Sequence, residues 1–236
     1  MSDKFNSSTV DEKGNSITDS SYQLALCIIE NVDGDARDIS SMVGYIKIHE
    51  SIFAPALVCE IGIRDEANFL EEFNITGNEI IHIEIETKSF DIENTLSYTF
   101  NVQRYNDYAR NAENSQVQAY TLVAVSEHAY IAPLKTISRT ISGTSTSIIE
   151  RIMKDDLNVS KFITFGKCST QFDGNINISN PLKAAMSVVN TAADINRTPY
   201  FLYQDLSGFV RLASLSYIND RDENPVCKTF VNKQKL

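Results

Sequence analysis

Apolar and polar residues alternate along several stretches between residues 22 and 125. The clearest is 81–86, Ile-His-Ile-Glu-Ile-Glu, in which the isoleucines share one face of an extended chain. Because successive side chains of a strand point to opposite faces, this pattern is typical of a half-buried antiparallel strand. Comparable patterns predict six strands, at residues 22–29, 43–50, 56–64, 79–87, 96–104 and 116–125.

Short turn motifs separate these strands. Asp33-Gly34-Asp35 and Thr76-Gly77-Asn78 join glycine to residues that favour tight turns. Six strands connected in this way predict an antiparallel barrel or sandwich. A short helix near residues 66–73 is expected to interrupt it.

The hydrophobic period becomes helical after Pro133. Ser147 and Glu150 fit a capping box, in which the serine accepts a free backbone N–H and the glutamate reaches back. The apolar residues of this helix are expected to share one face. They are Ile148, Ile149, Ile152 and Met153.

Asn180-Pro181 predicts the start of a second helix, because asparagine is a favoured cap and proline is tolerated at the first helical position. Residues 200–204 and 209–212 flank a four-residue loop, 205–208, that ends in glycine, and they predict a hairpin. The apolar residues of the helix recur at spacings of three and four: Leu182, Ala185, Met186, Val189 and Ala193.

These patterns predict an α+β protein. An N-terminal antiparallel β-barrel-like domain is expected at residues 22–125, followed by a smaller mixed α/β domain at 126–236. Residues 1–21 hold few apolar side chains, and they are expected to form a flexible N-terminal tail.

The composition is that of an ordinary globular protein. Of the 236 residues 42% are hydrophobic and 22% are charged, which excludes disorder of the whole chain. The sequence has no long apolar run and no N-terminal secretory pattern, so we expect a soluble protein made inside the cell. Its cysteines are then reduced thiols, with Cys27 and Cys59 acting as small hydrophobes in strands, whereas Cys168 and Cys227 have no partner at metal-ligand spacing.

Negative charge is concentrated in the N-terminal half. Residues 1–110 carry 20 acidic and 8 basic side chains, whereas residues 111–236 carry 11 and 13. Proteins grip nucleic acid mainly through Lys and Arg, so this balance disfavours DNA binding and is compatible with DNA passing without adhesion. Glu84 and Glu86, on the polar face of 79–87, are candidates for a wet face, either a channel wall or the outer surface.

The residues that could carry chemistry match no complete motif. His49, His82 and His128 lack partners at metal-ligand spacing. The segment 143–147 begins like a nucleophile elbow but has Ser147 in place of the second glycine, so helix capping explains it better. The segment 33–37 begins like a calcium loop but has Arg37 at a ligand position, so a surface turn explains it better.

Paired carboxylates are the remaining enzymatic signal. Glu71-Glu72 and Asp155-Asp156 are adjacent in sequence, and adjacent side chains on a helix point in different directions. A glycosidase needs two carboxylates about 5–9 Å apart around a sugar, which these pairs do not indicate. We therefore expect no enzyme, no catalytic, cofactor-binding or metal-binding residue, and no cofactor.

Three segments occur in an order and at separations that point to one family. They are 77–83 (Gly-Asn-Glu-Ile-Ile-His-Ile), 143–152 (Gly-Thr-Ser-Thr-Ser-Ile-Ile-Glu-Arg-Ile) and 199–210, an aromatic hairpin with a Gln-Asp turn. They resemble a strand-opening segment, the first helix after the barrel and a hairpin of the baseplate central hub (tube-domain) proteins of T-even-like contractile-tailed bacteriophages. The resemblance covers roughly residues 22–215.

The resemblance implies a structural role in the virion tail baseplate, assembled in the host bacterial cytoplasm. Hub subunits of that family form a trimeric ring between the tail tube and the central spike, and each carries two tube domains. This sequence holds one candidate tube domain and stops at Leu236, where a second should begin. The polypeptide is then truncated, or a shorter homologue fills the ring with six copies or with another protein.

The implied partners are copies of the same chain, the tail tube or its initiator, the spike and neighbouring baseplate proteins, with DNA only in passage and no membrane insertion. Two other functions stay open: a tail-associated carbohydrate-binding or hydrolysing module, and a tail-assembly chaperone. The first would need an exposed aromatic platform. Trp is absent, and Tyr200, Phe201 and Tyr203 are expected in the core.

Overall fold

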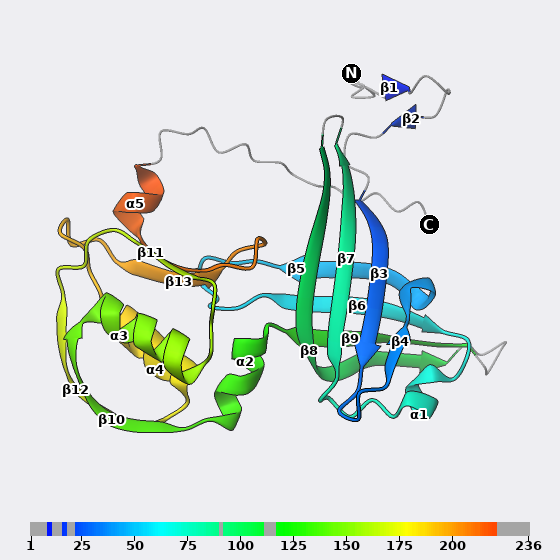
Figure 1. The fold of residues 1–236 in the computed structure, drawn as a ribbon, viewed down its shortest axis with the longest axis horizontal. Helices are drawn as coiled ribbons and strands as arrows, with labels where there is room; N and C mark the ends of the chain where they lie inside the picture. Colours follow the sequence, from blue (N-terminus) through cyan, green and yellow to red (C-terminus); the bar gives the residue numbers. More distant parts are fainter. Residues whose placement is uncertain (1–8, 11–15, 18–21, 90–91, 111–116, 221–236) are drawn as a thin grey trace, which may run out of the picture.

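The computed structural model describes residues 9–10, 16–17, 22–89, 92–110 and 117–220. A seven-stranded sheet forms the N-terminal part (Figure 1), and all of its neighbouring strands are antiparallel. The strand order is β4 (Ala36–Asp38), β3 (Tyr22–Glu30), β7 (Ile80–Ser89), β8 (Ile92–Arg110), β9 (Gln118–Val125), β6 (Val58–Asp65) and β5 (Val43–His49).

All six predicted strands are present in this sheet, and the prediction of a β-rich fold is confirmed. The predicted helix at 66–73 is shorter, as α1 (Phe69–Phe73), and a 3-10 turn, η1 (Ser40–Met42), precedes β5. In the predicted tail, β1 (Thr9–Val10) pairs with β2 (Ser16–Ile17). The remainder of residues 1–21 lies outside the described residues, so the flexible tail stays a prediction.

β8 is the strand that curls the sheet. Its first half pairs with β7, and from Asn101 onward it pairs with β9. The register shifts twice along the second half, and Asp107 adopts a φ of 55° there. Bulges of this kind bend a strand and increase its twist. As a result β3, β7 and the first half of β8 run upright in Figure 1, whereas β5, β6 and β9 lie across them.

The curled sheet is a half-barrel rather than a closed barrel. β4 and β5 stand at the two ends of the strand order and are not paired with each other in the described part of the chain. The inner face of the sheet holds a hydrophobic cluster that includes Ile81 and Ile83, both fully buried. Their polar neighbours on β7 point to the other face, as the alternation predicts.

Cys27 and Cys59 lie fully buried in this cluster, and both are free thiols, as is Cys168. Burial raises the pKa of Cys27 to about 12 and also raises that of Cys59. Both side chains therefore stay protonated near neutral pH and pack as small hydrophobes, as predicted. Cys227 lies outside the described residues.

A second hydrophobic cluster forms the C-terminal part of the chain, where helices pack between two small sheets (Figure 1). β10 (Ile137–Thr144) pairs with β12 (Gln171–Ser179), and β14 (Val210–Ser214) lies between β11 (Phe162–Phe165) and β13 (Tyr200–Gln204). The helical elements are α2 (Glu127–Ile131), η2 (Ala132–Leu134), α3 (Ser145–Arg151), the π-helical turn η3 (Ile152–Asp156), α4 (Pro181–Val189) and α5 (Leu215–Asn219).

The two predicted helix starts have different outcomes. Asn180 caps α4 by accepting the N–H groups of Leu182 and Lys183, with Pro181 at the first helical position, as predicted. The capping box at Ser147 is wrong, because the helix begins earlier: Thr144 is the cap and accepts the N–H of Ser147.

The predicted apolar faces are largely confirmed. Ile148, Ile149, Ile152 and Met153 are all buried, although the last two belong to the π-helical turn η3. α4 ends at Val189, so Ala193 lies outside the helix to which the spacing assigned it. None of the helices in the described ranges is both long and apolar enough to cross a membrane.

A buried carboxylate organises the loop before β13. Asp194 accepts the backbone N–H groups of Asn196 (2.8 Å) and Thr198 (2.9 Å) and the hydroxyls of Thr198 and Ser216. The Ser216 hydroxyl is the largest influence, and together these donors lower the pKa of Asp194 to about 2. The carboxylate thereby ties the loop to the start of α5.

This arrangement predicts acid lability. The pKa of Asp194 is lower in the folded chain than the value of about 3.9 expected when unfolded. Its contribution to the free energy of unfolding is therefore full above about pH 5 and disappears as the pH falls to about 2. Urea unfolding at several pH values in this range should show that acidification lowers the free energy of unfolding less for Asp194→Asn than for the unmodified chain. The exposed Asp220→Asn is the control, and an Asp194→Asn chain with the unmodified pH dependence would contradict the assignment.

Candidate functional site

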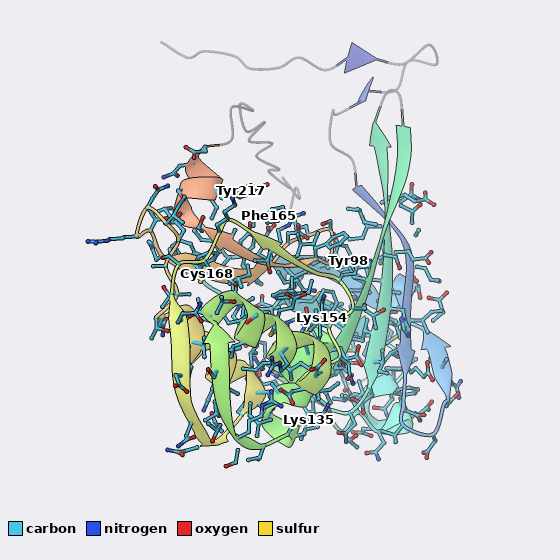
Figure 2. All side chains as sticks on the ribbon, turned by 60° about the vertical axis from the view of Figure 1, so that its left-hand side comes forward. Tyr98, Lys135, Lys154, Phe165, Cys168 and Tyr217 are labelled. Carbon is cyan, nitrogen blue, oxygen red and sulfur yellow. The ribbon has the colours of Figure 1, made fainter. Side chains whose placement is uncertain are left out.

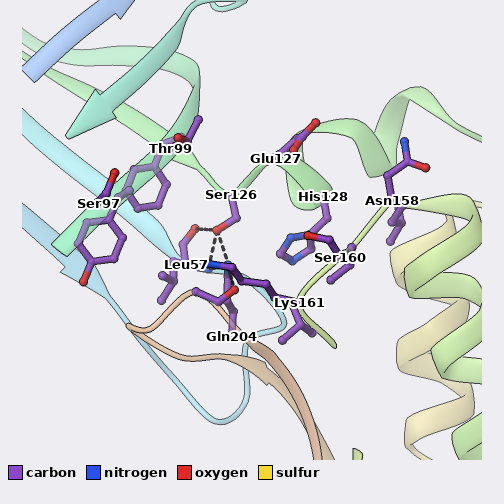
Figure 3. Close-up of a pocket in the computed structure, with 16 residues that line it drawn as sticks. Leu57, Ser97, Thr99, Ser126, Glu127, His128, Asn158, Ser160, Lys161 and Gln204 are labelled. Carbon is purple, nitrogen blue, oxygen red and sulfur yellow. Dashed lines mark hydrogen bonds between the residues drawn. The ribbon is translucent and has the colours of Figure 1, made fainter. Parts of the chain in front are cut away.

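The sheet and the C-terminal part meet at a polar junction centred on Gln204. Its Oε1 accepts the backbone N–H of Leu57 at 3.0 Å and the hydroxyl of Ser126 (Figure 3). Leu57 precedes β6, Ser126 follows β9 and Gln204 ends β13. One side-chain amide therefore joins three segments that are distant in sequence.

A cleft of about 370 Å³ opens beside this junction. Ser126 and Gln204 lie at its floor in Figure 3, with Ser97 and Thr99 of β8 on one side and residues 158–161 on the other. Glu127 and Lys161 also line the cleft, and both residues are exposed. The cleft thus presents hydroxyl groups, amide groups and two opposite charges.

His128 and Tyr130 of α2 strengthen the junction. Nε2 of His128 donates to the carbonyl of Pro55 at 2.8 Å, and burial lowers the pKa of this histidine. The ring is therefore neutral at pH 7, and its Nε2 is used by the hydrogen bond to Pro55. The hydroxyl of Tyr130 donates to Oδ1 of Asn78 at 2.7 Å, which ties α2 to the turn before β7.

The two end strands of the described sheet, β4 and β5, are the second feature of functional interest. β5 has exposed Gly44, Lys47 and His49 between half-buried residues, and β4 is exposed along its whole length. The outer side of an edge strand presents unpaired backbone N–H and C=O groups. Each end of the half-barrel therefore offers a place where another strand can be added.

The outer face of β7 carries the predicted wet residues. Glu86 is exposed and Glu84 is half-buried, next to His82 on the same face. His82 contacts Oγ1 of Thr99 through Nδ1 at 3.1 Å, and its Nε2 lies 4.0 Å from the carboxylate of Glu30. This face of β7 is therefore polar and carries two carboxylates.

The other histidines and carboxylates do not converge. His49 lies 3.6 Å from Glu60 on the neighbouring strand, and Asp156 is paired with Arg139 at 3.2 Å. Glu71 and Glu72 are exposed on α1. Among the described residues no three histidine, cysteine or acidic side chains form a group that could hold a metal ion.

The two partial motifs lie at a helix start and in a surface turn, although the cap of the helix is Thr144 and not the predicted Ser147. In the 143–147 segment Thr144 caps α3, and Ser147 donates to its backbone carbonyl at 2.8 Å. In the 33–37 segment Arg37 pairs with Asp35 at 3.2 Å within a surface turn.

The aromatic hairpin lies mostly inward. Tyr200 is buried, whereas Phe201 and Tyr203 are half-buried. The ring of Phe201 meets that of Phe53 edge-on, with centroids 5.6 Å apart. The prediction that these three residues belong to the core is therefore right for Tyr200 and only partly right for the other two.

Some residues of interest had no sequence signal. Gln204 lies in a predicted strand, and no motif in the sequence marks it. Its hydrogen bonds reach two segments that are more than 75 residues away in the chain. Ile52, Phe53 and Leu206 are apolar but exposed, which a pattern of alternation does not reveal.

No protein-family model matches the chain, and no curated protein is significantly similar to it. Similar solved structures include a tail protein from Neisseria meningitidis, with 11% identity and a TM-score of 0.47, covering 81% of this chain and 51% of that one. The 43 kDa tail protein of prophage MuSo2 from Shewanella oneidensis has 11% identity and a TM-score of 0.45, covering 79% and 53%.

An Escherichia coli component of the type VI secretion system, described as structurally similar to bacteriophage T4 tail proteins, has 8% identity and a TM-score of 0.42, covering 84% and 47%. The structural neighbours are thus phage tail and type VI secretion proteins. The chain spans about half the length of the proteins it matches. TM-scores below 0.5 do not establish a common fold.

Proposed function

We propose that the chain is a structural subunit of a phage tail baseplate hub, forming a ring that joins the tail tube to the central spike and lets DNA pass. It acts through contacts between copies and with the tube, spike and neighbouring baseplate proteins, not through catalysis, and it needs no cofactor. Residues 22–125 are its tube domain, residues 126–236 its mixed domain, and residues 1–21 a flexible tail.

The observation that carries this proposal is the half-barrel, in which β4 and β5 each pair with one neighbouring strand of the described residues. A strand added to such an edge satisfies the unpaired backbone groups. Because β4 and β5 are different surfaces on opposite ends of the sheet, pairing β5 of one copy with β4 of the next is a head-to-tail contact. Head-to-tail contacts that close produce a ring.

The acidic face of β7 supports the proposal that the ring lets DNA pass. We assign the face of β7 that carries Glu84 and Glu86 to the wall of a water-filled channel. Like charges at a packed contact between copies would cost stability, whereas water and salt screen them over about 8–10 Å. A negative wall also repels the phosphates of DNA in transit.

Sedimentation velocity and native mass spectrometry of the purified chain test the ring. We expect a closed oligomer, with three copies favoured and six possible. Proline is then placed at Ile46, Lys47 and Ile48 of β5 in turn. Since successive N–H groups point to opposite sides of a strand, the variants in which the outward N–H is lost should fold and stay monomeric.

Circular dichroism separates these variants from those in which proline removes a bond to β6 and lowers stability. A wild-type chain that is monomeric would contradict the ring. Folded proline variants that all still form the wild-type oligomer would show that β5 is not the contact.

A further inference from the structure

Two buried polar atoms of β9 have no hydrogen-bond partner among the described protein atoms. They are Oε1 of Gln118 and the hydroxyl oxygen of Tyr120. Gln118 is 3% exposed and Tyr120 is 2% exposed, so bulk solvent does not reach either side chain. A buried polar group without a partner is costly, and nearly all such groups in folded proteins are hydrogen-bonded to protein or to ordered water.

The strand ladder brings these two side chains beside Asp65. Asp65 is fully buried at the end of β6 and lies directly opposite Gln118 of β9. Tyr120 is two residues further along β9, and residues two apart on a strand share one face of the sheet. The three polar side chains therefore gather on the inner face, at the end of the hydrophobic cluster to which Ile63 and Tyr120 belong.

The orientation of the Gln118 amide is fixed by Asn68. Nδ2 of Asn68 donates to Oε2 of Glu71 at 2.9 Å, and an ionised carboxylate can only accept. Oδ1 of Asn68 therefore faces Gln118 and accepts the hydrogen of its Nε2 at 3.0 Å. Because the nitrogen is used in this way, Oε1 of Gln118 is the atom that still needs a donor.

Tyr120 needs an acceptor, because its hydroxyl stays protonated at neutral pH. Burial, and to a smaller extent the negative charge of Asp65, raises the pKa of this hydroxyl. Oδ2 of Asp65 has capacity left, since within the described residues it receives only the N–H of Leu70 and a carboxylate oxygen can accept two hydrogen bonds. The Tyr120 hydroxyl does not reach this oxygen directly.

We propose that one internal water molecule is bound between Gln118, Tyr120 and Asp65. The water accepts the O–H of Tyr120 and donates one hydrogen to Oε1 of Gln118 and the other to Oδ2 of Asp65. Buried waters typically make about three hydrogen bonds to groups of this kind. A metal cation would take the same oxygens and leave the Tyr120 proton without an acceptor, whereas water satisfies every group. The water thereby links β9 to the carboxylate that holds the start of α1, within one chain and without any assembly of copies.

A high-resolution crystal structure of the 236-residue chain identifies the occupant. We expect one peak of density at about 2.6–3.0 Å from Oε1 of Gln118, the hydroxyl of Tyr120 and Oδ2 of Asp65, which are hydrogen-bond distances. Contacts of about 2.3–2.6 Å from six or more oxygens would show a cation such as Ca²⁺ and overturn the assignment. A direct hydrogen bond between Gln118 and Tyr120, with no density between them, would also overturn it.

Oxygen-17 magnetic relaxation dispersion measures the same water in solution. Tyr120→Phe keeps the shape of the ring but removes one of three hydrogen bonds, so the residence time of the water should fall about fivefold to tenfold. The double variant with Gln118→Leu and Tyr120→Phe should lose one long-lived water. Tyr105→Phe is the matched control, because Tyr105 is exposed and its ring meets that of Tyr120 with centroids 6.4 Å apart. This control should keep both the number of long-lived waters and their residence times.

The two variants keep the proposal falsifiable if one of them is unstable. A folded double variant with as many long-lived waters as the unmodified chain would overturn the site. If circular dichroism shows that the double variant is unfolded, the single variant decides, and an unchanged residence time in Tyr120→Phe overturns the proposal.

Discussion

The variant Phe100→Ala is expected to lose about 3–5 kcal/mol of the free energy of unfolding. Phe100 is 1% exposed, lies next to the bend of β8 and stacks on Tyr98 with ring centroids 5.9 Å apart. Alanine leaves a cavity between the two halves of the curled sheet, where surrounding strands are held by their hydrogen bonds and cannot collapse to fill it. Urea unfolding measures the loss as a lower midpoint with an unchanged slope.

Ser97→Ala, on the same strand, is the control, because Ser97 is exposed on the other face of β8. It should change stability by less than about 0.5 kcal/mol. A Phe100→Ala chain with a loss below about 1 kcal/mol would mean that β8 does not direct this ring into the core.

The variant Asp65→Ala is expected to lose about 3 kcal/mol of the free energy of unfolding. Asp65 is fully buried at the end of β6, and its carboxylate accepts the backbone N–H groups of Ala67 (3.0 Å), Phe69 (2.9 Å) and Leu70 (3.0 Å). The N–H groups of Phe69 and Leu70 are the free donors at the start of α1, and alanine leaves both half-buried without an acceptor. Thermal and urea unfolding both report the change.

Asp65→Asn keeps one side-chain oxygen and should lose an intermediate amount. Asp33→Ala, at an exposed turn carboxylate, should be nearly neutral. Equal stability of Asp65→Ala and Asp33→Ala would contradict the role of Asp65 as the anchor of α1.

Strands with one buried face could be predicted from the sequence, and strands without one could not. β7 was evident because Ile81 and Ile83 are buried while Glu86 is exposed. β4 had no signal, because all of its residues are exposed and it exists only by pairing with β3. β8 is longer than predicted for the same reason, since its ends are largely polar.

The misplaced helix start has a tertiary cause. Thr144 and Ser147 are both good caps, and local sequence does not choose between them. The choice is made by β10, whose ladder with β12 extends to the pair Thr144–Gln171 and leaves the chain free to turn into a helix at Ser145. Such long-range pairing is not visible in a local pattern.

The candidate surfaces were predictable only in part. The acidic character of β7 followed from the alternation of Glu84 and Glu86 with isoleucines. The junction was not predictable, since Gln204 acts on Leu57 across 147 residues of chain. The exposure of Phe53 likewise depends on how the loop after β5 lies against β13.

A view from the side shows how these parts combine: the C-terminal part, which carries Lys135, Lys154 and Cys168, stands beside the upright strands of the sheet (Figure 2). Gln204 and His128 fix this arrangement at the junction.

Cryo-electron microscopy of an assembled tail that contains this chain is the most direct test of the proposed hub. The account predicts a closed ring, coaxial with the tail tube and above the spike, in which adjacent copies meet through β5 and β4 and the face of β7 with Glu84 and Glu86 lines the channel. A single copy at the baseplate periphery, or a ring whose acidic face points away from the axis, would contradict it.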